Sequence, residues 1–282
     1  YQINELSSVK ASYNRIAQYL HLISNTTSAT PLDVWAPSGS FIDPQIANQV
    51  ALGYFRNFKD NTYSLEVEAY YKTVDNRIDY IDGADLIAQN TIETEILVGE
   101  SRAYGLEFLL RKNKGKFTGW LSYTLSKSEQ RTPGGAAGGP GINDGDWYNT
   151  PFDRTHDISF TGSYQLNDKW RFGTNFIFQT GRPVTYPNGQ FDYNDLIIPT
   201  YSDRNADRLP AYHRLDISAT LTPRKNINRK WKSEWNFGIY NVYNRRNAAS
   251  ITFGQNSETA AVEATRTAIF GIIPSVTYNF KF

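Results

Sequence analysis

The chain has 282 residues, and 29 basic side chains balance 28 acidic ones, for a net charge of +1. This balance gives no signal for binding nucleic acid or another polyanion. Cysteine is absent, which excludes a disulfide framework and a thiolate metal site.

Aromatic residues make up 15% of the chain, yet its mean hydropathy is −0.52. Many aromatic side chains in a polar background are typical of a sheet with one apolar and one wet face. The chain has no Met, no signal segment and no apolar run of the ~20 residues that a membrane helix needs. Because it also opens on what reads as the tail of a strand, we expect it to be a fragment whose native N-terminus lies upstream.

Apolar side chains recur with a period of two, which indicates strands. In residues 170–178, for example, aromatic side chains and Thr174 alternate with Arg171, Gly173, Asn175 and Ile177. The pattern predicts about ten two-faced strands, at 8–23, 46–58, 62–81, 100–113, 116–130, 153–167, 169–181, 212–225, 230–246 and 265–282.

The connections between these strands alternate in length. Short polar turns are predicted at 59–61, 113–115, 167–168 and 225–229, and long loops at 24–45, 82–99, 131–152, 182–211 and 247–264. Short turns at one end and long loops at the other are typical of an outer-membrane β-barrel. The glycine-rich run at 133–141 predicts a mobile loop within this set.

A soluble sandwich or propeller is the alternative fold. In a sandwich, the apolar face would pack on a second sheet. Here the apolar face is crowded with Phe, Tyr and Trp near the strand ends, as the interfacial girdle of a membrane barrel requires. We therefore predict an all-β, antiparallel transmembrane barrel.

Several segments resemble TonB-dependent outer-membrane receptors, in the family's order. They are RAYGLE at 102–107, GWLSYTLS at 119–126, PFDRTHD at 151–157, YHRLD at 212–216, YNVYNRRN at 240–247 and the terminal IPSVTYNFKF at 273–282. The closest resemblance is to receptors with a carboxypeptidase-regulatory-like domain upstream. It implies that residues 1–282 are the C-terminal portion of a barrel of about 22 strands, and that the plug and the N-terminal barrel strands are absent from this chain.

The resemblance also implies a function, which is active import of a scarce nutrient (siderophore, vitamin, peptide or glycan) across the Gram-negative outer membrane. It places the long loops outside the cell and the C-terminus in the periplasm. The implied partners are outer-membrane lipid, the TonB energising complex through the absent N-terminal part, the rest of the barrel and plug, and a surface lipoprotein; no nucleic acid is expected. A passive porin-like or structural barrel, and an outer-membrane hydrolase, are the rival functions.

The sequence predicts no enzyme, cofactor or metal site. The three histidines, His21, His156 and His213, are far apart and form no ligand pair. The segment Asp153–Asp157 combines carboxylates with an imidazole, which suits acid–base catalysis. We favour a structural hydrogen-bonding role for it at a loop–strand junction.

Two groups of residues are candidate functional positions. The first consists of charged residues that alternate with apolar neighbours and are therefore expected to face a wet lumen, because a charge facing hydrocarbon is costly. They either pair across strands, or dock the plug or guide substrate. The residues of this first group are Glu66, Glu68, Glu107, Asp157, Arg214, Asp216 and Glu234. The second is a substrate-contacting set in loop 182–211, which could equally be self-packed: Tyr186, Phe191, Tyr193 and Tyr201.

Overall fold

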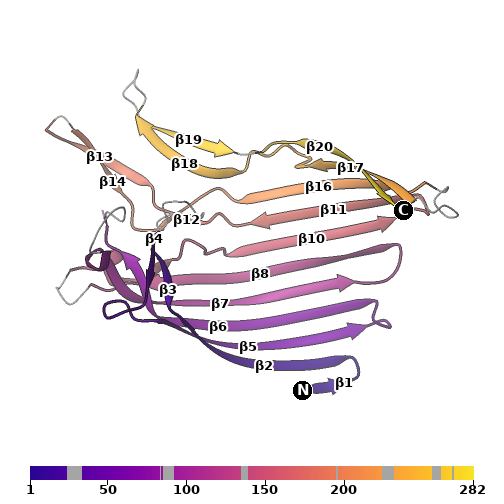
Figure 1. Ribbon diagram of the computed structural model, residues 1–282, viewed down its shortest axis with the longest axis horizontal. Helices are drawn as coiled ribbons and strands as arrows, with labels where there is room; N and C mark the ends of the chain where they lie inside the picture. Colours follow the sequence, from indigo (N-terminus) through magenta and orange to yellow (C-terminus); the bar gives the residue numbers. More distant parts are fainter. Residues whose placement is uncertain are drawn as a thin grey trace.

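The computed structural model describes residues 1–23, 34–82, 84, 92–134, 139–194, 196–223, 232–255, 262–268 and 270–282. Its main feature is one antiparallel sheet in which strands that follow one another along the chain pair side by side (Figure 1). The strand order is β1-β2-β5-β6-β7-β8-β10-β11-β16-β17-β20, and short β9 pairs with β8. Within the described residues, no helix is long and apolar enough to cross a membrane.

Each of the ten predicted strands has a counterpart in this sheet. Short β1 (Gln2–Asn4) and β9 (Tyr148–Asn149) are additional. The ten long strands are β2 (Ser7–Gln18), β5 (Gln45–Phe58), β6 (Tyr63–Tyr80), β7 (Ile96–Lys112), β8 (Phe117–Arg131), β10 (His156–Gln165), β11 (Trp170–Gln179), β16 (Tyr212–Leu221), β17 (Lys232–Tyr240) and β20 (Ile273–Lys281).

Three predicted strands were too long, because the chain leaves the main sheet before the period-two pattern ends. The predicted strand 8–23 divides at Tyr19, and β3 (Leu20–Ile23) pairs with β4 (Val34–Pro37) instead. The predicted strand 230–246 stops at Tyr240, where Asn241 and Asn244 adopt left-handed φ values of 54°. The predicted strand 265–282 is two strands, since β19 (Val262–Ala268) pairs with β18 (Ala248–Gln255) and only β20 joins the sheet.

The sheet has one apolar and one polar face, as the register shows. Paired residues point to the same side. Phe172 lies opposite Ala219, and Trp235 opposite Tyr278, on the apolar face. This face is left uncovered, since Leu52 and Val276 expose 57% and 63% of their surface. A sandwich would bury these side chains, so the structure contradicts that alternative.

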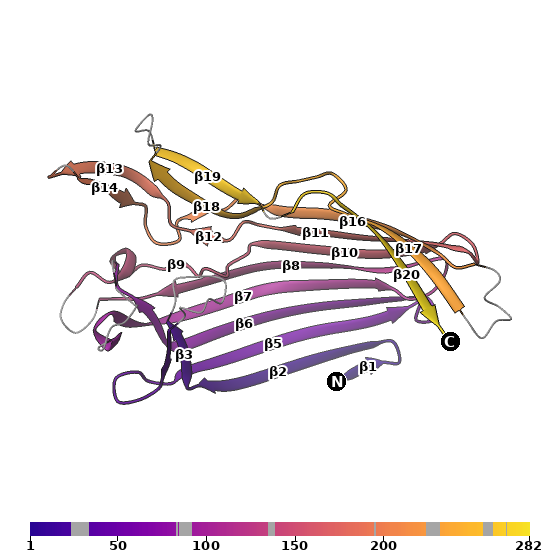
Figure 2. The same cartoon turned by 45° about the horizontal axis from the view of Figure 1, so that its top comes forward.

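The two ends of the sheet differ. At one end the strands are joined by tight turns such as residues 59–61, which all have positive φ, and the C-terminus lies there (Figure 1). At the other end, three of the five long connections carry hairpins of their own in the described residues (Figure 2): β3–β4, β12 (Pro183–Val184) with β15 (Asp207–Arg208), β13 (Pro187–Tyr193) with β14 (Leu196–Tyr201), and β18–β19.

A small apolar cluster joins the hairpin end to the sheet. Ile23, Ala36, Ile42 and Ile78 are buried there, and Ile96 packs against them. The 3-10 turns η1 (Ile92–Thr94) and η2 (Ile142–Gly145) lie in the connections that lead to β7 and to β9. The predicted turn at 225–229 and residues 135–138 of the glycine-rich run lie outside the described residues.

Candidate ligand-binding cavity

A cavity of about 590 Å³ lies at the hairpin end, between the polar face of the sheet and the segment that carries β12 and β15. The ends of β2, β5, β6 and β8 form one wall, with Gln18, Gln45, Asp79 and Gln130. The segment 182–209 forms the opposite wall. The volume of the cavity is within the ~300–1,000 Å³ range of small-molecule binding sites.

Asp79 organises the wall on the sheet side. One carboxylate oxygen accepts hydrogen bonds from Tyr148 Oη and Gln130 Nε2, both at 2.6 Å, and the other accepts from Arg204 Nη1 at 2.8 Å. Arg204 also pairs with Asp82, and its guanidinium lies 4.4 Å from the centre of the Tyr80 ring. Burial and the charge of Asp79 raise the pKa of Tyr148, so the phenol stays protonated and donates. The charge of Arg204 is thereby balanced by carboxylates.

Two buried polar atoms on the cavity lining have no hydrogen-bond partner in the described chain. One is Gln130 Oε1; its residue is only 3% exposed, and Nε2 is already shared between Asp79 and Tyr148. The other is Tyr186 Oη, whose ring is held edge-on against Phe253 at 5.1 Å between centroids. Burial followed by the charge of Asp207 raises the pKa of Tyr186, which keeps this hydroxyl a donor. An unpartnered buried polar atom costs ~1–3 kcal/mol, so such atoms in a cavity indicate a place for an outside partner.

Two arginines give the cavity a positive charge. Arg182 donates from Nη2 to the Ala249 carbonyl at 3.3 Å, and neither Arg182 nor Arg77 forms an ion pair with a carboxylate among the described residues. Burial, followed by the charge of nearby Arg154, lowers the pKa of Arg182. Burial and the charge of Arg77 likewise lower the pKa of His21. An anion would be stabilised between these guanidinium groups.

The comparison with known families identifies the sheet. Residues 1–242 match the family model described as "TonB dependent receptor-like, beta-barrel". The chain belongs to this family. This family belongs to the Gram-negative outer membrane. In outer-membrane β-barrels the polar face lines the interior and the apolar face contacts lipid, so the two faces of the sheet are called the lumen face and the lipid face below.

Solved receptors share the fold at low sequence identity. The chain is 15% identical to the ferric-catecholate import receptor Fiu of E. coli K12, with a TM-score of 0.59, and covers 100% of itself and 34% of Fiu. For the ferripyoverdine receptor of Pseudomonas aeruginosa the identity is 13% and the TM-score 0.59, and the match covers 100% of this chain and 32% of that receptor. For BauA, the ferric preacinetobactin receptor of Acinetobacter baumannii, the identity is 16% and the TM-score 0.57, and the match covers 99% of this chain and 35% of BauA. No curated protein matches the chain. The chain thus spans about a third of the length of these receptors.

The seven charged residues predicted for the lumen all lie on the polar face by register, and none lines the cavity. Four of them have polar partners on that face. Arg214 pairs with Asp216 at 2.9 Å, Asp157 accepts from Gln179 at 2.8 Å, and Glu234 accepts from Asn279 at 3.2 Å. Glu68 and Glu107 face each other directly across β6 and β7, and Glu66 is one position along the same face.

The structure separates the four predicted loop aromatics. Tyr186 lines the cavity. Phe191, Tyr193 and Tyr201 lie on the β13–β14 hairpin, where they are 50%, 61% and 60% exposed. They do not line the cavity, so the loop presents two surfaces rather than one.

Three residues that line the cavity were not predicted from the sequence: Arg77, Gln130 and Arg182. Only Gln130 has a local sequence signal for facing the cavity, which is its place on the polar face of its strand.

The Asp153–Asp157 segment is a structural junction. Asp153 pairs with Arg208, and its other carboxylate oxygen accepts from the Ser128 backbone N–H at 2.5 Å. His156 lies on the lipid face instead, where Nδ1 is 3.0 Å from Tyr123 Oη. No histidine in the described ranges contacts a carboxylate, and no cluster of potential metal ligands occurs there.

Proposed function

We propose that this chain is the C-terminal part of the barrel of an active importer. A part of the receptor outside this chain would supply the remaining strands, a plug and the segment that contacts TonB. The receptor would belong to the group that carries a carboxypeptidase-regulatory-like domain. In this proposal the hairpin end faces outward and the tight-turn end faces the periplasm. The alternation of tight turns and long hairpin-bearing connections supports that orientation.

The cavity at the hairpin end is the proposed site of nutrient capture. The observation that carries this proposal is the presence of two orphaned buried groups, Gln130 Oε1 and Tyr186 Oη, in one cavity. A ligand that satisfies them needs a donor for the amide oxygen and an acceptor for the phenol. Arg77 and Arg182 favour a carboxylate or another anionic group on the same ligand. Among siderophores, vitamins, peptides and glycans, we therefore infer an acidic nutrient with hydroxyl or amide groups.

Binding of probe pairs that match in size but differ in charge tests this inference on the purified full-length receptor. Digalacturonate can be compared with galactobiose, and Glu-Glu with Gln-Gln, by calorimetry at low and moderate salt. We expect the acidic member of at least one pair to bind at least tenfold more tightly, since a charge-assisted hydrogen bond contributes ~1.5–3 kcal/mol.

Variants locate the binding to the cavity. Arg182→Gln and Gln130→Leu should weaken binding of the acidic probe about tenfold or more, because each removes a ligand contact. Arg171→Gln is the matched control, since Arg171 lies on the lumen face at the tight-turn end, outside the cavity lining. Equal losses in Arg182→Gln and Arg171→Gln would show that only the net charge of the barrel matters.

Shortening loop 182–211 should weaken nutrient binding and leave the barrel folded, because the main sheet does not include this loop. Two deletions separate its two surfaces. Removal of residues 184–206 takes away Tyr186 and should abolish the binding. Removal of 188–200 takes away only the outer hairpin and should leave the cavity contacts in place. Similar affinity for the intact receptor and the 184–206 deletion would place recognition on the plug or elsewhere in the lumen.

Uptake by cells distinguishes an importer from the rival functions. The proposal expects accumulation of the bound nutrient to need both this receptor and TonB, and to saturate with concentration. Uptake that is linear and unaffected by loss of TonB would indicate a passive pore. Release of a cleaved product by the purified protein would indicate a hydrolase.

A further inference from the structure

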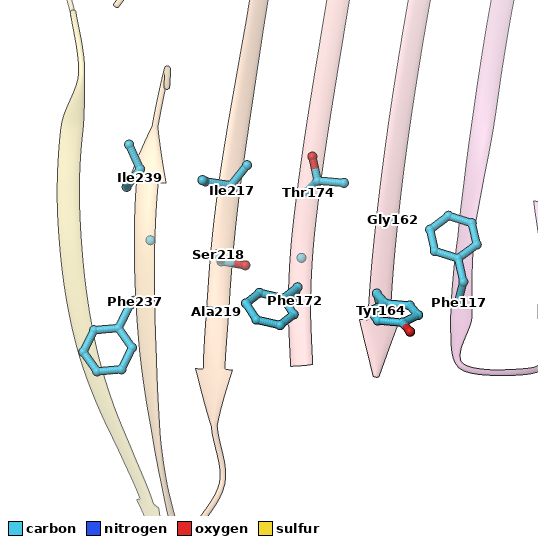
Figure 3. A pocket seen from close by; sticks show the side chains of 12 residues that line it. Phe117, Gly162, Tyr164, Phe172, Thr174, Ile217, Ser218, Ala219, Phe237 and Ile239 are labelled. Carbon is cyan, nitrogen blue, oxygen red and sulfur yellow. The ribbon is translucent and has the colours of Figure 1, made fainter. Parts of the chain in front are cut away.

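The lipid face of the sheet carries a groove of about 450 Å³ near the tight-turn end (Figure 3). Its floor is made of small residues on three neighbouring strands, Gly162 on β10, Thr174 on β11 and Ala219 on β16. Larger side chains stand around this floor: Phe117, Tyr164, Phe172, Ile217, Phe237 and Ile239. The groove is thus a gap between bulky side chains at this end of the lipid face.

A larger residue would not fit at Gly162, because neighbouring side chains already surround the place that a Cβ atom would take. A Cβ atom placed on Gly162 would lie 3.0 Å from Phe160, 3.1 Å from Phe117 and 3.2 Å from Thr174. Ala219 lies opposite Phe172 on one side and Phe237 on the other, and leaves a gap between the two rings. In an outer-membrane barrel this face contacts hydrocarbon. An acyl chain is therefore the occupant whose chemistry matches the lining.

Two lysines lie close to the Tyr63 ring at the tight-turn end, and one of them also reaches a side chain that lines the groove. Lys112 Nζ is 5.8 Å from the centre of the Phe117 ring, which lines the groove, and 5.7 Å from that of Tyr63. Lys59 Nζ, from the neighbouring tight turn, is also 5.7 Å from the Tyr63 ring. Neither lysine is ion-paired with a carboxylate in the part of the chain that the structure describes. Lysines next to Tyr at the end of an apolar band are at the level of lipid headgroups.

We propose that the groove and this lysine pair form a binding site for one anionic glycerophospholipid. An acyl chain fills the groove over Ala219, between the rings of Phe172 and Phe237, and the phosphate lies between Lys59 and Lys112. The charge of the pair favours a headgroup with net negative charge, such as phosphatidylglycerol, over a zwitterionic one that brings its own ammonium. The site is at the tight-turn end, so the lipid belongs to the leaflet on that side, which the proposed orientation makes the periplasmic one.

Native mass spectrometry of the purified full-length receptor tests the site. The probes are phosphatidylglycerol and phosphatidylethanolamine with identical chains, and lipid A. We expect tighter binding of phosphatidylglycerol than of the other two. Lys112→Gln and Lys59→Gln should each weaken phosphatidylglycerol binding about fivefold, with little change for phosphatidylethanolamine. Lys10→Gln is the matched control, because Lys10 lies on the lumen face of β2, opposite Gly53.

A second variant tests the groove independently of charge. Ala219→Leu should weaken the binding of both phospholipids, because it fills the place of the chain. Ala69→Leu, at an exposed alanine of the lipid face outside the groove, should change neither. Equal binding of the two phospholipids by the unaltered receptor, or equal effects of Lys112→Gln and Lys10→Gln, would overturn the proposal. Preference for lipid A would overturn the assignment of the leaflet. None of these readouts depends on nutrient uptake, so the site can fail while the proposed transport function stands.

Discussion

Replacing Phe176 by Arg is expected to destabilise the folded receptor by ~2–4 kcal/mol if it lies near the bilayer midplane. Phe176 lies within β11 on the lipid face, between Phe160 of β10 and Leu215 of β16. A guanidinium at this position has hydrocarbon on its open side and no anion beside it. The cost falls toward the interfaces because long cationic side chains can there reach the headgroups.

The adjacent position is the matched control. Asn175 lies on the lumen face, where Thr161 Oγ1 donates to Asn175 Oδ1 at 2.9 Å and Asp216 lies directly opposite. Asn175→Arg therefore places the same charge in a wet environment beside a carboxylate, and a cost below ~1 kcal/mol is expected. Urea titration of the full-length receptor folding into lipid vesicles measures both changes. Equal destabilisation would contradict the assignment of the two faces.

Replacing Asp153 by Ala is expected to cost ~3–5 kcal/mol in local or global stability, as removal of one partner of a buried ion pair does. The Asp153 side chain is fully buried, and it holds Arg208 and the Ser128 N–H at once. Arg208 also donates to the Gly181 carbonyl at 3.0 Å. Loss of the carboxylate therefore releases the base of the segment that forms one wall of the cavity.

Limited proteolysis within residues 182–211, alongside urea unfolding, measures this effect. Asp146→Ala serves as the control, because Asp146 is exposed and has no side-chain hydrogen bond or ion pair in the described structure. Faster cleavage only in Asp153→Ala is the expected result. Unchanged cleavage and stability would leave the structural role of the Asp153–Asp157 segment without support and would reopen a role in chemistry.

The strands and their faces follow from short stretches of sequence. A strand needs only alternation between apolar and polar side chains, and this is visible within eight to ten residues, as in β11, where Ile177 is the one apolar residue in the series on the polar face. The same alternation placed Glu68, Glu107 and Asp216 on the polar face without knowledge of their partners. Strand ends were less predictable, because the pattern around Phe270 continues where the chain changes from one hairpin to the main sheet.

The cavity could not be predicted in this way. Asp79 and Arg204 are 125 residues apart, and Gln130 and Tyr186 belong to different elements, yet all four meet at one end of the sheet. Which loop folds back, and against which strand, depends on register and hairpin packing across the whole sheet. Alternation with a period of two residues is a local property of an extended backbone. It was therefore enough to predict where the strands lie and which face each side chain is on. The buried ion pairs, the unpartnered groups of the cavity and the groove at Ala219 arise from contacts between separate strands and loops, so the tertiary structure alone decided them.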